Sequence, residues 1–186
     1  MQQENQNTAG GEKTARLSTA LREWVIAILI ALLVALLLTQ VVFVNAQVPS
    51  ESMEDTIQVN DRVLGLRFVY LFEDPARYDI MIFHYPDDET QLYVKRVIGM
   101  PGEQLEIRDG LVYIDGQSTP LETGFVKGAL RGNFGPYTIP EDCYFVMGDN
   151  RNESWDSRYW QNTFVRRERV VGRVWLRLFP SPGTIS

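Results

Sequence analysis

The sequence predicts a mainly β, barrel- or sandwich-like domain of short strands that follows one N-terminal transmembrane helix. An uncharged, apolar run covers residues 24–44. After residue 60, closely spaced short segments are rich in β-branched and aromatic residues. No stretch after residue 48 keeps the 3.6-residue apolar period of a capped helix. Together these observations favour an antiparallel barrel or sandwich over a parallel sheet.

The N-terminal part divides into a tail and a membrane span. Residues 1–23 are polar and lack an apolar period, which predicts a disordered tail. Residues 24–44 hold only two polar side chains, Thr39 and Gln40, and about 20 helical residues cross a bilayer core. A buried helix of a soluble core would need one polar side, and this run has none. We therefore expect a transmembrane helix over 24–44.

Charge on the two sides of the span predicts its orientation. The basic residues Lys13, Arg16 and Arg22 precede it, whereas the first charges after it are acidic. By the positive-inside bias, the tail is cytoplasmic and residues 45–186 form an exported domain. A cleavable signal peptide is the alternative, because Ala46 ends a small-residue pattern, but its apolar region is only about 7–15 residues long. A retained signal-anchor is therefore predicted, with cleavage after Ala46 left open.

Short strands are predicted throughout the exported domain, at residues 62–70, 79–85, 90–100, 103–117, 143–147 and 169–179. Within 103–117, two Asp-Gly pairs flank alternating residues, which is typical of a β-hairpin. Short helical turns are possible near 72–77 or 166–168. Residues 118–137 are rich in Gly and Pro and are predicted to form an extended loop or lobe.

Composition excludes several function classes. The net charge of −6 lies after the span and forms no basic stripe, so no nucleic-acid partner is expected. The single cysteine, Cys143, excludes an internal disulfide and a multi-thiolate zinc site. The single histidine, His84, lies in an apolar strand and is interpreted as structural or surface-exposed. We expect no metal and no cofactor, and a serine nucleophile would need a base other than imidazole.

Two features supply candidate chemistry. Ser50 and Ser52 lie two residues apart, so in an extended segment they point to the same side. Lys95 lies in an apolar strand beside Tyr93 and Val97, and burial lowers the pKa of a lysine by up to several units. A neutral amine can activate a serine hydroxyl. The pattern alone also allows an ordinary surface lysine.

A third segment, residues 147–160, reads MGDNRNESWDSRYW. Its Asn, Asp, Ser and Arg side chains predict a hydrogen-bonded polar loop between apolar strands. A long solvated loop would have a similar composition, but Trp155, Tyr159 and Trp160 do not fit that interpretation.

Three ordered motifs, PSESM at 49–53, YVKRVIGMPGE at 93–103 and GDNRNESWDSR at 148–158, resemble the signature boxes of bacterial type I signal (leader) peptidases, peptidase family S26. The resemblance covers nearly all of residues 20–180, including an anchor directly before the first box. It implies a membrane-bound serine endopeptidase that uses a Ser-Lys dyad and an acyl-enzyme.

The resemblance assigns roles to individual residues. Ser52 would be the nucleophile and Lys95 the general base. Ser50 would be an oxyanion-hole hydroxyl, and Ser154 would hold the lysine amine. Structural support would come from an Asp156–Arg158 ion pair and from the remaining charged residues of the third box, Asp149 and Arg151.

The same resemblance implies the substrate and its location. Signal-peptide-bearing preproteins would be cut after Ala-x-Ala at the outer face of the cytoplasmic membrane, by a monomer anchored in the lipid bilayer. An extended substrate would add as a strand to an exposed edge. Our expectation for that edge and its apolar pockets is Pro49 together with Ile80, Ile82 and Phe83.

The chain departs from the family pattern at several positions. Glu54-Asp55-Thr56-Ile57 replaces a usual Pro-Thr-Leu, Tyr78 replaces a usual Gly, and Asn152 stands where Asp is common. None of these departures removes a proposed catalytic group. The alternatives are a self-cleaving repressor-type Ser-Lys peptidase, whose DNA-binding module is not visible here, and a membrane-tethered β-barrel binding protein without peptidase activity.

Overall fold

A computed structural model describes residues 4–54, 56–121, 124–126 and 130–185. The chain divides into two compact units, with the boundary between Val41 and Val42. The first contains nearly all of helix α1, Glu4–Val42, and the second is mainly β. The predicted fold class, a β-rich domain after one apolar helix, is confirmed.

Helix α1 is longer than the predicted span. Residues Leu21–Val42 form a candidate membrane-crossing segment with a mean hydropathy of 3.0, and the chain then enters strand β1 at Phe43. The tail was expected to be disordered, whereas the structure continues the helix back to Glu4. Ala, Gln, Glu, Lys and Arg are good helix formers, and adding residues to an existing helix avoids the cost of nucleation.

The larger sheet has the strand order β1-β2-β10-β3-β4-β8-β9, and β11 pairs with β10. Its members are β1 Phe43–Gln47, β2 Arg62–Leu66, β3 Ile80–Tyr85, β4 Asp88–Gly99, β8 Cys143–Met147, β9 Val165–Arg166, β10 Val170–Phe179 and β11 Gly183–Thr184. All of their pairings are antiparallel. Four reversals separate β1 from β4, so these two strands run in the same direction.

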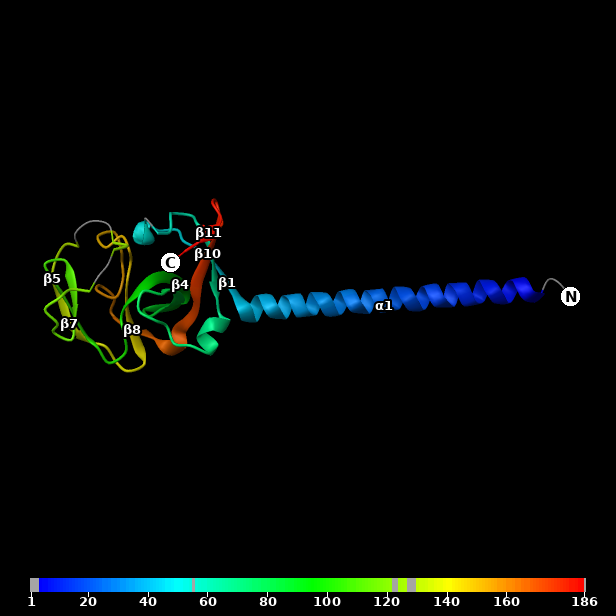
Figure 1. Ribbon diagram of the computed structural model, residues 1–186, viewed down its shortest axis with the longest axis horizontal. Helices are drawn as coiled ribbons and strands as arrows, with labels where there is room; N and C mark the ends of the chain where they lie inside the picture. Colours follow the sequence, from blue (N-terminus) through cyan, green and yellow to red (C-terminus); the bar gives the residue numbers. More distant parts are fainter. Residues whose placement is uncertain (1–3, 55, 122–123, 127–129, 186) are drawn as a thin grey trace. The chain divides into compact units, whose positions relative to one another are not determined.

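A smaller sheet has the order β6-β5-β7, made of β5 Gln104–Arg108, β6 Leu111–Ile114 and β7 Phe134–Thr138. Figure 1 shows β5 and β7 at the end of the β-rich unit opposite to β1 and β10. The predicted hairpin is confirmed: Arg108 pairs with Leu111, and Asp109 and Gly110 both have positive φ, as a two-residue type I′ turn requires.

Two sequence expectations need correction in the β-rich unit. Part of the segment predicted as a loop, 118–137, contributes to β7, which pairs with β5. Pro136 has no N–H to donate to a neighbouring strand, so the sequence favoured a loop here. An edge strand such as β7 tolerates proline, because one of its sides needs no hydrogen-bond partner. Residues 122–123 and 127–129 of that segment lie outside the described residues. The 3-10 turns are η1 Glu51–Met53, η2 Phe68–Leu71 and η3 Arg167–Arg169, and only η3 overlaps a predicted position.

Three apolar clusters fill the β-rich unit. One joins β1 to β3 and includes Val44, Met53 and Ile82. Another lies beneath the smaller sheet and contains Cys143, which is buried. A third includes Phe83 and Trp160. Met53 anchors η1 in the first cluster, so this short turn after β1 is held by the core.

Candidate active site

Ser52 lies in η1, just after β1, and is 3% exposed. The backbone around it is tied to the loop that follows β8. The N–H of Asn150 donates to the Ser52 carbonyl at 3.2 Å, and the Asn150 side-chain amide donates to the Glu51 carbonyl at 3.2 Å. The first and third sequence motifs therefore meet at this serine.

Lys95 lies in β4 and is 4% exposed. Its Nζ lies 2.6 Å from Ser52 Oγ. Strand alternation correctly predicted that Lys95 shares a face with Tyr93, because Nζ lies 5.5 Å from the centre of the Tyr93 ring. The second motif thus brings a buried amine into hydrogen-bonding contact with the buried hydroxyl.

Burial changes the acid-base chemistry of this amine. Loss of hydration lowers the pKa of Lys95 to about 8, helped by the positive charge of Arg158 and opposed by the negative charges of Asp156 and Asp149. The usual pKa of lysine is about 10.4. A substantial neutral fraction is therefore present near physiological pH, and a neutral amine can accept a proton.

Ser50 brings a second hydroxyl to the same place. Its backbone is extended, with φ −114° and ψ 158°, and its Oγ lies 3.0 Å from Ser52 Oγ. Unlike Ser52, Ser50 is exposed. Two hydroxyls therefore meet where the chain leaves β1, one buried against the amine and one facing the solvent.

The structure brings Asp156 and Arg158 together as predicted. Their side chains form a buried ion pair at 2.7 Å, each with 0% exposure. Arg158 also donates to the Arg151 carbonyl at 2.6 Å. The pair fixes the loop after β8, because the N–H of Gly148 donates to Asp156 Oδ2 at 3.0 Å.

Ser154 is buried within the same loop, with 6% exposure. Its hydroxyl donates to Asp156 Oδ2 at 2.7 Å. In the described part of the chain, Ser154 makes no direct hydrogen bond to the Lys95 amine. The role expected for Ser154 as a holder of that amine thus stays a prediction.

Asp149 has a partner that the sequence did not suggest. Arg96 donates to both of its carboxylate oxygens at 2.8 Å, and Thr56 adds a hydrogen bond at 2.6 Å. Arg151, which was expected in the same scaffold, is 2% exposed. Its Nε and Nη2 have no hydrogen-bond partner among the described residues, and burial lowers its pKa to about 10. The sequence did hold a signal for Arg96: a second basic residue directly after Lys95 in an otherwise apolar strand indicates a buried charge that needs an acidic partner.

A cavity of about 340 Å³ opens onto the serine and the lysine. One wall is the segment from Gln47 to Ser52, and the other is the β4 segment from Gln91 to Lys95. Glu153 and Trp155 complete the lining. The cavity therefore lies between the end of β1 and the first half of β4.

Pro49 lines this cavity, but Ile80, Ile82 and Phe83 do not. These three residues of β3 are 4%, 0% and 0% exposed and belong to the apolar core. Strand β3 lies between β10 and β4, so both of its edges are already paired. A substrate strand therefore cannot pair with β3, and β4 lines the cavity instead. The expectation that the side chains of Ile80, Ile82 and Phe83 form substrate pockets stays a prediction.

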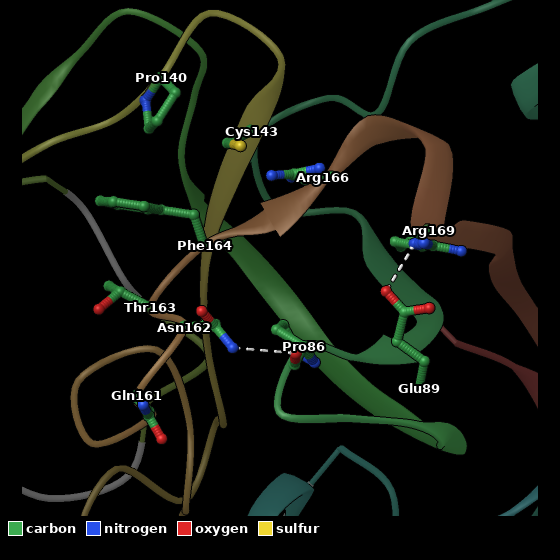
Figure 2. A pocket seen from close by; sticks show the side chains of 10 residues that line it. All are labelled: Pro86, Glu89, Pro140, Cys143, Gln161, Asn162, Thr163, Phe164, Arg166 and Arg169. Carbon is green, nitrogen blue, oxygen red and sulfur yellow. Dashed lines mark hydrogen bonds and ion pairs between the residues drawn. The ribbon is translucent and has the colours of Figure 1, made fainter.

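A larger cavity, about 510 Å³, lies elsewhere on the domain (Figure 2). Figure 2 shows Arg169 paired with Glu89, at 2.8 Å, and Asn162 bonded to the Pro86 carbonyl, at 3.2 Å. Cys143 also lines it, and burial raises the pKa of that thiol to about 11, which keeps it protonated. None of the predicted site residues lies there, so size does not identify the reactive site.

The match to a known family now agrees with this geometry. The model of "Signal peptidase, peptidase S26" matches residues 21–179. The chain belongs to the signal peptidase family. Members of this family are serine peptidases that remove signal peptides, and they are membrane-associated, in keeping with the apolar span in α1.

Two curated relatives, one from a cyanobacterium and one from a Bacillus, support the family assignment. A probable signal peptidase I-2 of Synechocystis is 38% identical over 73% of this chain and 62% of its own length. A signal peptidase I of Bacillus licheniformis is 37% identical over 91% of this chain and 94% of its own length. A solved signal peptidase I of Enterococcus faecalis V583 is 35% identical, with a TM-score of 0.47 over 54% of this chain and 97% of that one.

Proposed function

We propose that this chain is a membrane-anchored type I signal peptidase that cleaves exported preproteins through a Ser52–Lys95 dyad. The observation that carries the proposal is the 2.6 Å contact between two buried groups, Ser52 Oγ and Lys95 Nζ. A buried lysine is costly to keep in its charged form, so its amine is suited to act as a base. No histidine is needed for this chemistry.

In the first half of the reaction, neutral Lys95 accepts the Ser52 proton while Ser52 Oγ attacks the scissile carbonyl. Collapse of the tetrahedral intermediate breaks the peptide C–N bond. Lys95 then gives its proton to the leaving amine, and the signal peptide remains as an ester on Ser52. In the second half, Lys95 takes a proton from water, hydroxide adds to the ester, and the proton returns to Ser52.

Ser50 supports the oxyanion of the tetrahedral intermediate in this proposal. Its hydroxyl lies 3.0 Å from Ser52 Oγ and is not buried, so it can turn toward a carbonyl that Ser52 attacks. The backbone N–H of Ser52 is the second donor. Removing one such donor typically lowers turnover about 10²–10³-fold.

The substrate would bind as an extended strand between β1 and β4. In the described residues, β1 pairs only with β2, and the pairing of β4 with β8 begins at Arg96. The earlier residues of β4 therefore keep backbone groups available on the side toward the cavity. A peptide that pairs with both walls would point its side chains at −1 and −3, counted back from the cleaved bond, toward the floor of the cavity. Small side chains such as Ala fit shallow pockets there.

The orientation of the protein follows from charge. The basic residues of the tail precede the apolar segment of α1, and acidic residues follow it. By the positive-inside bias, the tail is cytoplasmic and the β-rich unit is extracytoplasmic. That places the active site on the side where exported precursors emerge.

The test is incubation of the purified full-length protein, in detergent, with a precursor that carries an Ala-x-Ala signal peptide. We expect a single cut after the last Ala, identified by N-terminal sequencing of the product, and labelling of Ser52 by a serine-reactive acylating agent. Ser52→Ala should lose both signals, and Lys95→Met should lose cleavage while the domain stays folded. Strong cleavage by Lys95→Met would contradict the dyad. Absence of cleavage by the wild type would favour a binding protein.

A further inference from the structure

Trp155 is an exposed aromatic residue in the wall of the reactive cavity. It lines the same cavity as Ser52 and Lys95, and it is 56% exposed, whereas its neighbours Ser154 and Asp156 are buried. None of the steps described above uses it. A large apolar side chain exposed beside a reactive serine is a candidate contact for substrate.

The indole ring is held in a fixed position. One face stacks on Tyr159, with ring centres 5.4 Å apart and planes 11° apart. Its Nε1–H donates to the Tyr85 hydroxyl at 3.3 Å. A ring that is already ordered loses little conformational entropy when a ligand packs against it. The stacked face is covered, so a ligand in the cavity meets the other face or the ring edge.

The position of Trp155 along the cavity follows from its partner. Tyr85 stacks on Tyr93, with ring centres 4.4 Å apart and planes 3° apart. Tyr93 precedes Lys95 by two residues in β4, which corresponds to about 7 Å along a strand. Trp155 is therefore held on the Tyr93 side of β4, in the part of the cavity wall that precedes Lys95 along the strand.

We propose that the exposed indole of Trp155 forms an apolar subsite for the side chain of the signal peptide at −2 or −4. The proposal rests on the proposed function for the identity of the ligand. Side chains at −1 and −3 point to the cavity floor in that binding mode, so the intervening side chains point the other way. An aliphatic or aromatic side chain there would cover the exposed indole, and the preference would add to the requirement for small residues at −1 and −3.

The experiment uses the full-length protein in detergent and matched peptides with Ala at −1 and −3. Each pair of peptides differs only by Leu or Ser at −2 or −4. We expect the wild type to favour Leu at one of these positions by about tenfold in kcat/KM, a typical discrimination by an apolar contact. Trp155→Ala should reduce this preference to within about twofold, and Trp155→Phe should keep most of it.

The control variant is Trp175→Ala, because Trp175 is 46% exposed in β10 and does not line the cavity. It should keep the wild-type preference. Discrimination between Ala and Leu at −1 should be the same in Trp155→Ala as in the wild type, because the floor pockets are untouched. A purely structural role for Trp155 would instead lower all rates together. A Leu preference that survives in Trp155→Ala would overturn the proposal.

A binding measurement separates this proposal from the catalytic one. The same peptides are titrated against Ser52→Ala and against the Ser52→Ala, Trp155→Ala double variant. A lower Kd for the Leu peptides with Ser52→Ala, lost in the double variant, supports the subsite. If the wild type cuts no peptide, that result refutes the proposed function but leaves this support for the subsite unchanged. Equal Kd values for the Leu and Ser peptides with Ser52→Ala would overturn the subsite.

Discussion

The proposed role of Lys95 as a general base depends on the exclusion of water from its amine. The amine is 4% exposed, and loss of hydration is the largest cause of its lowered pKa. Asp156 and Asp149 act in the opposite direction, but each is paired with an arginine at less than 3 Å, Arg158 and Arg96 respectively. Because both acids are paired, two buried carboxylates can lie near an amine that must lose its proton to act as the proposed base.

The pH dependence of kcat/KM follows from this residue. In the proposed dyad, only the neutral amine can accept the Ser52 proton, and the pKa of Lys95 is lowered to about 8. We expect kcat/KM to rise about tenfold per pH unit below pH 8 and to level off above it. Steady-state cleavage of a peptide between pH 6 and 10 measures this profile. A rate that is constant from pH 6 to 8, or that rises on acidification, would contradict a lysine base.

Asp156 is the residue whose loss should destabilise the domain most directly. Asp156→Asn removes the negative charge beside fully buried Arg158 and leaves that guanidinium uncompensated. Breaking a buried pair in this way costs about 3–5 kcal/mol in the free energy of unfolding. Urea denaturation measures it. The control is Glu168→Gln, whose exposed pairs with Arg166 at 3.9 Å and Arg169 at 3.8 Å should together contribute less than about 1 kcal/mol. Equal stabilities of the two variants would contradict this account.

Sequence reasoning singled out Ser52 and Lys95, which the structure brings into contact, but it missed some of their surroundings. Ser52 and Lys95 were predictable because a hydroxyl pair beside a span and a lysine in an apolar strand each leave a local signal. Arg96 as the partner of Asp149 was missed, because pairing between distant segments depends on strand register. Trp155 was recognised as unusual for a solvated loop, but only the structure placed it in the wall of the cavity.

At the level of elements, the site depends on the close approach of two loops at Gly148. A Cβ atom at this position would overlap the Ser52 carbonyl oxygen and Ser154 Oγ. Any side chain would therefore push η1 away from the end of β8. Glycine is needed here for its small size, because the backbone of one loop touches the backbone that carries the reactive serine.

Gly148→Ala should consequently impair both activity and stability. We expect kcat/KM to fall at least about 10²-fold, because a shift of about 1 Å at a reacting group has effects of this size. The free energy of unfolding should fall by about 1–3 kcal/mol from overpacking. Gly183→Ala is the matched control, since nothing lies within 4 Å of its added carbon. A Gly148→Ala enzyme with wild-type kinetics would show that the two loops do not need this contact.

The strands themselves were largely predictable, and their partners were not. Alternation and the Asp-Gly turn identified β3, β4 and the β5–β6 hairpin. Alternation tells which side chains share a face, but it does not tell which strand edge stays unpaired. The substrate edge was assigned to β3 for that reason, although β3 is enclosed between β10 and β4.

At the scale of the whole molecule, the chain joins an apolar helix directly to a domain with its own core. Strand β1 begins at Phe43, one residue after α1 ends at Val42. Ser52 comes ten residues after the end of α1, so a short length of chain links the helix to the proposed nucleophile. Membrane association of the family and the apolar segment Leu21–Val42 imply that the enzyme meets its preproteins at the bilayer.

The pairing of strand β1 also affects how well the enzyme resists cleavage by other copies of itself. Ala46 resembles a processing position in sequence, but it is 9% exposed and pairs with Val63 inside a five-residue ladder. A second enzyme molecule would have to peel β1 from β2 before it could attack the bond after Ala46. We expect prolonged self-incubation in detergent to leave this bond intact, as judged by intact mass. Rapid autolysis at Ala46 would mean that β1 detaches readily from β2. An intact bond would mean that pairing of β1 within the sheet protects the link between the helix and the catalytic domain from the enzyme itself.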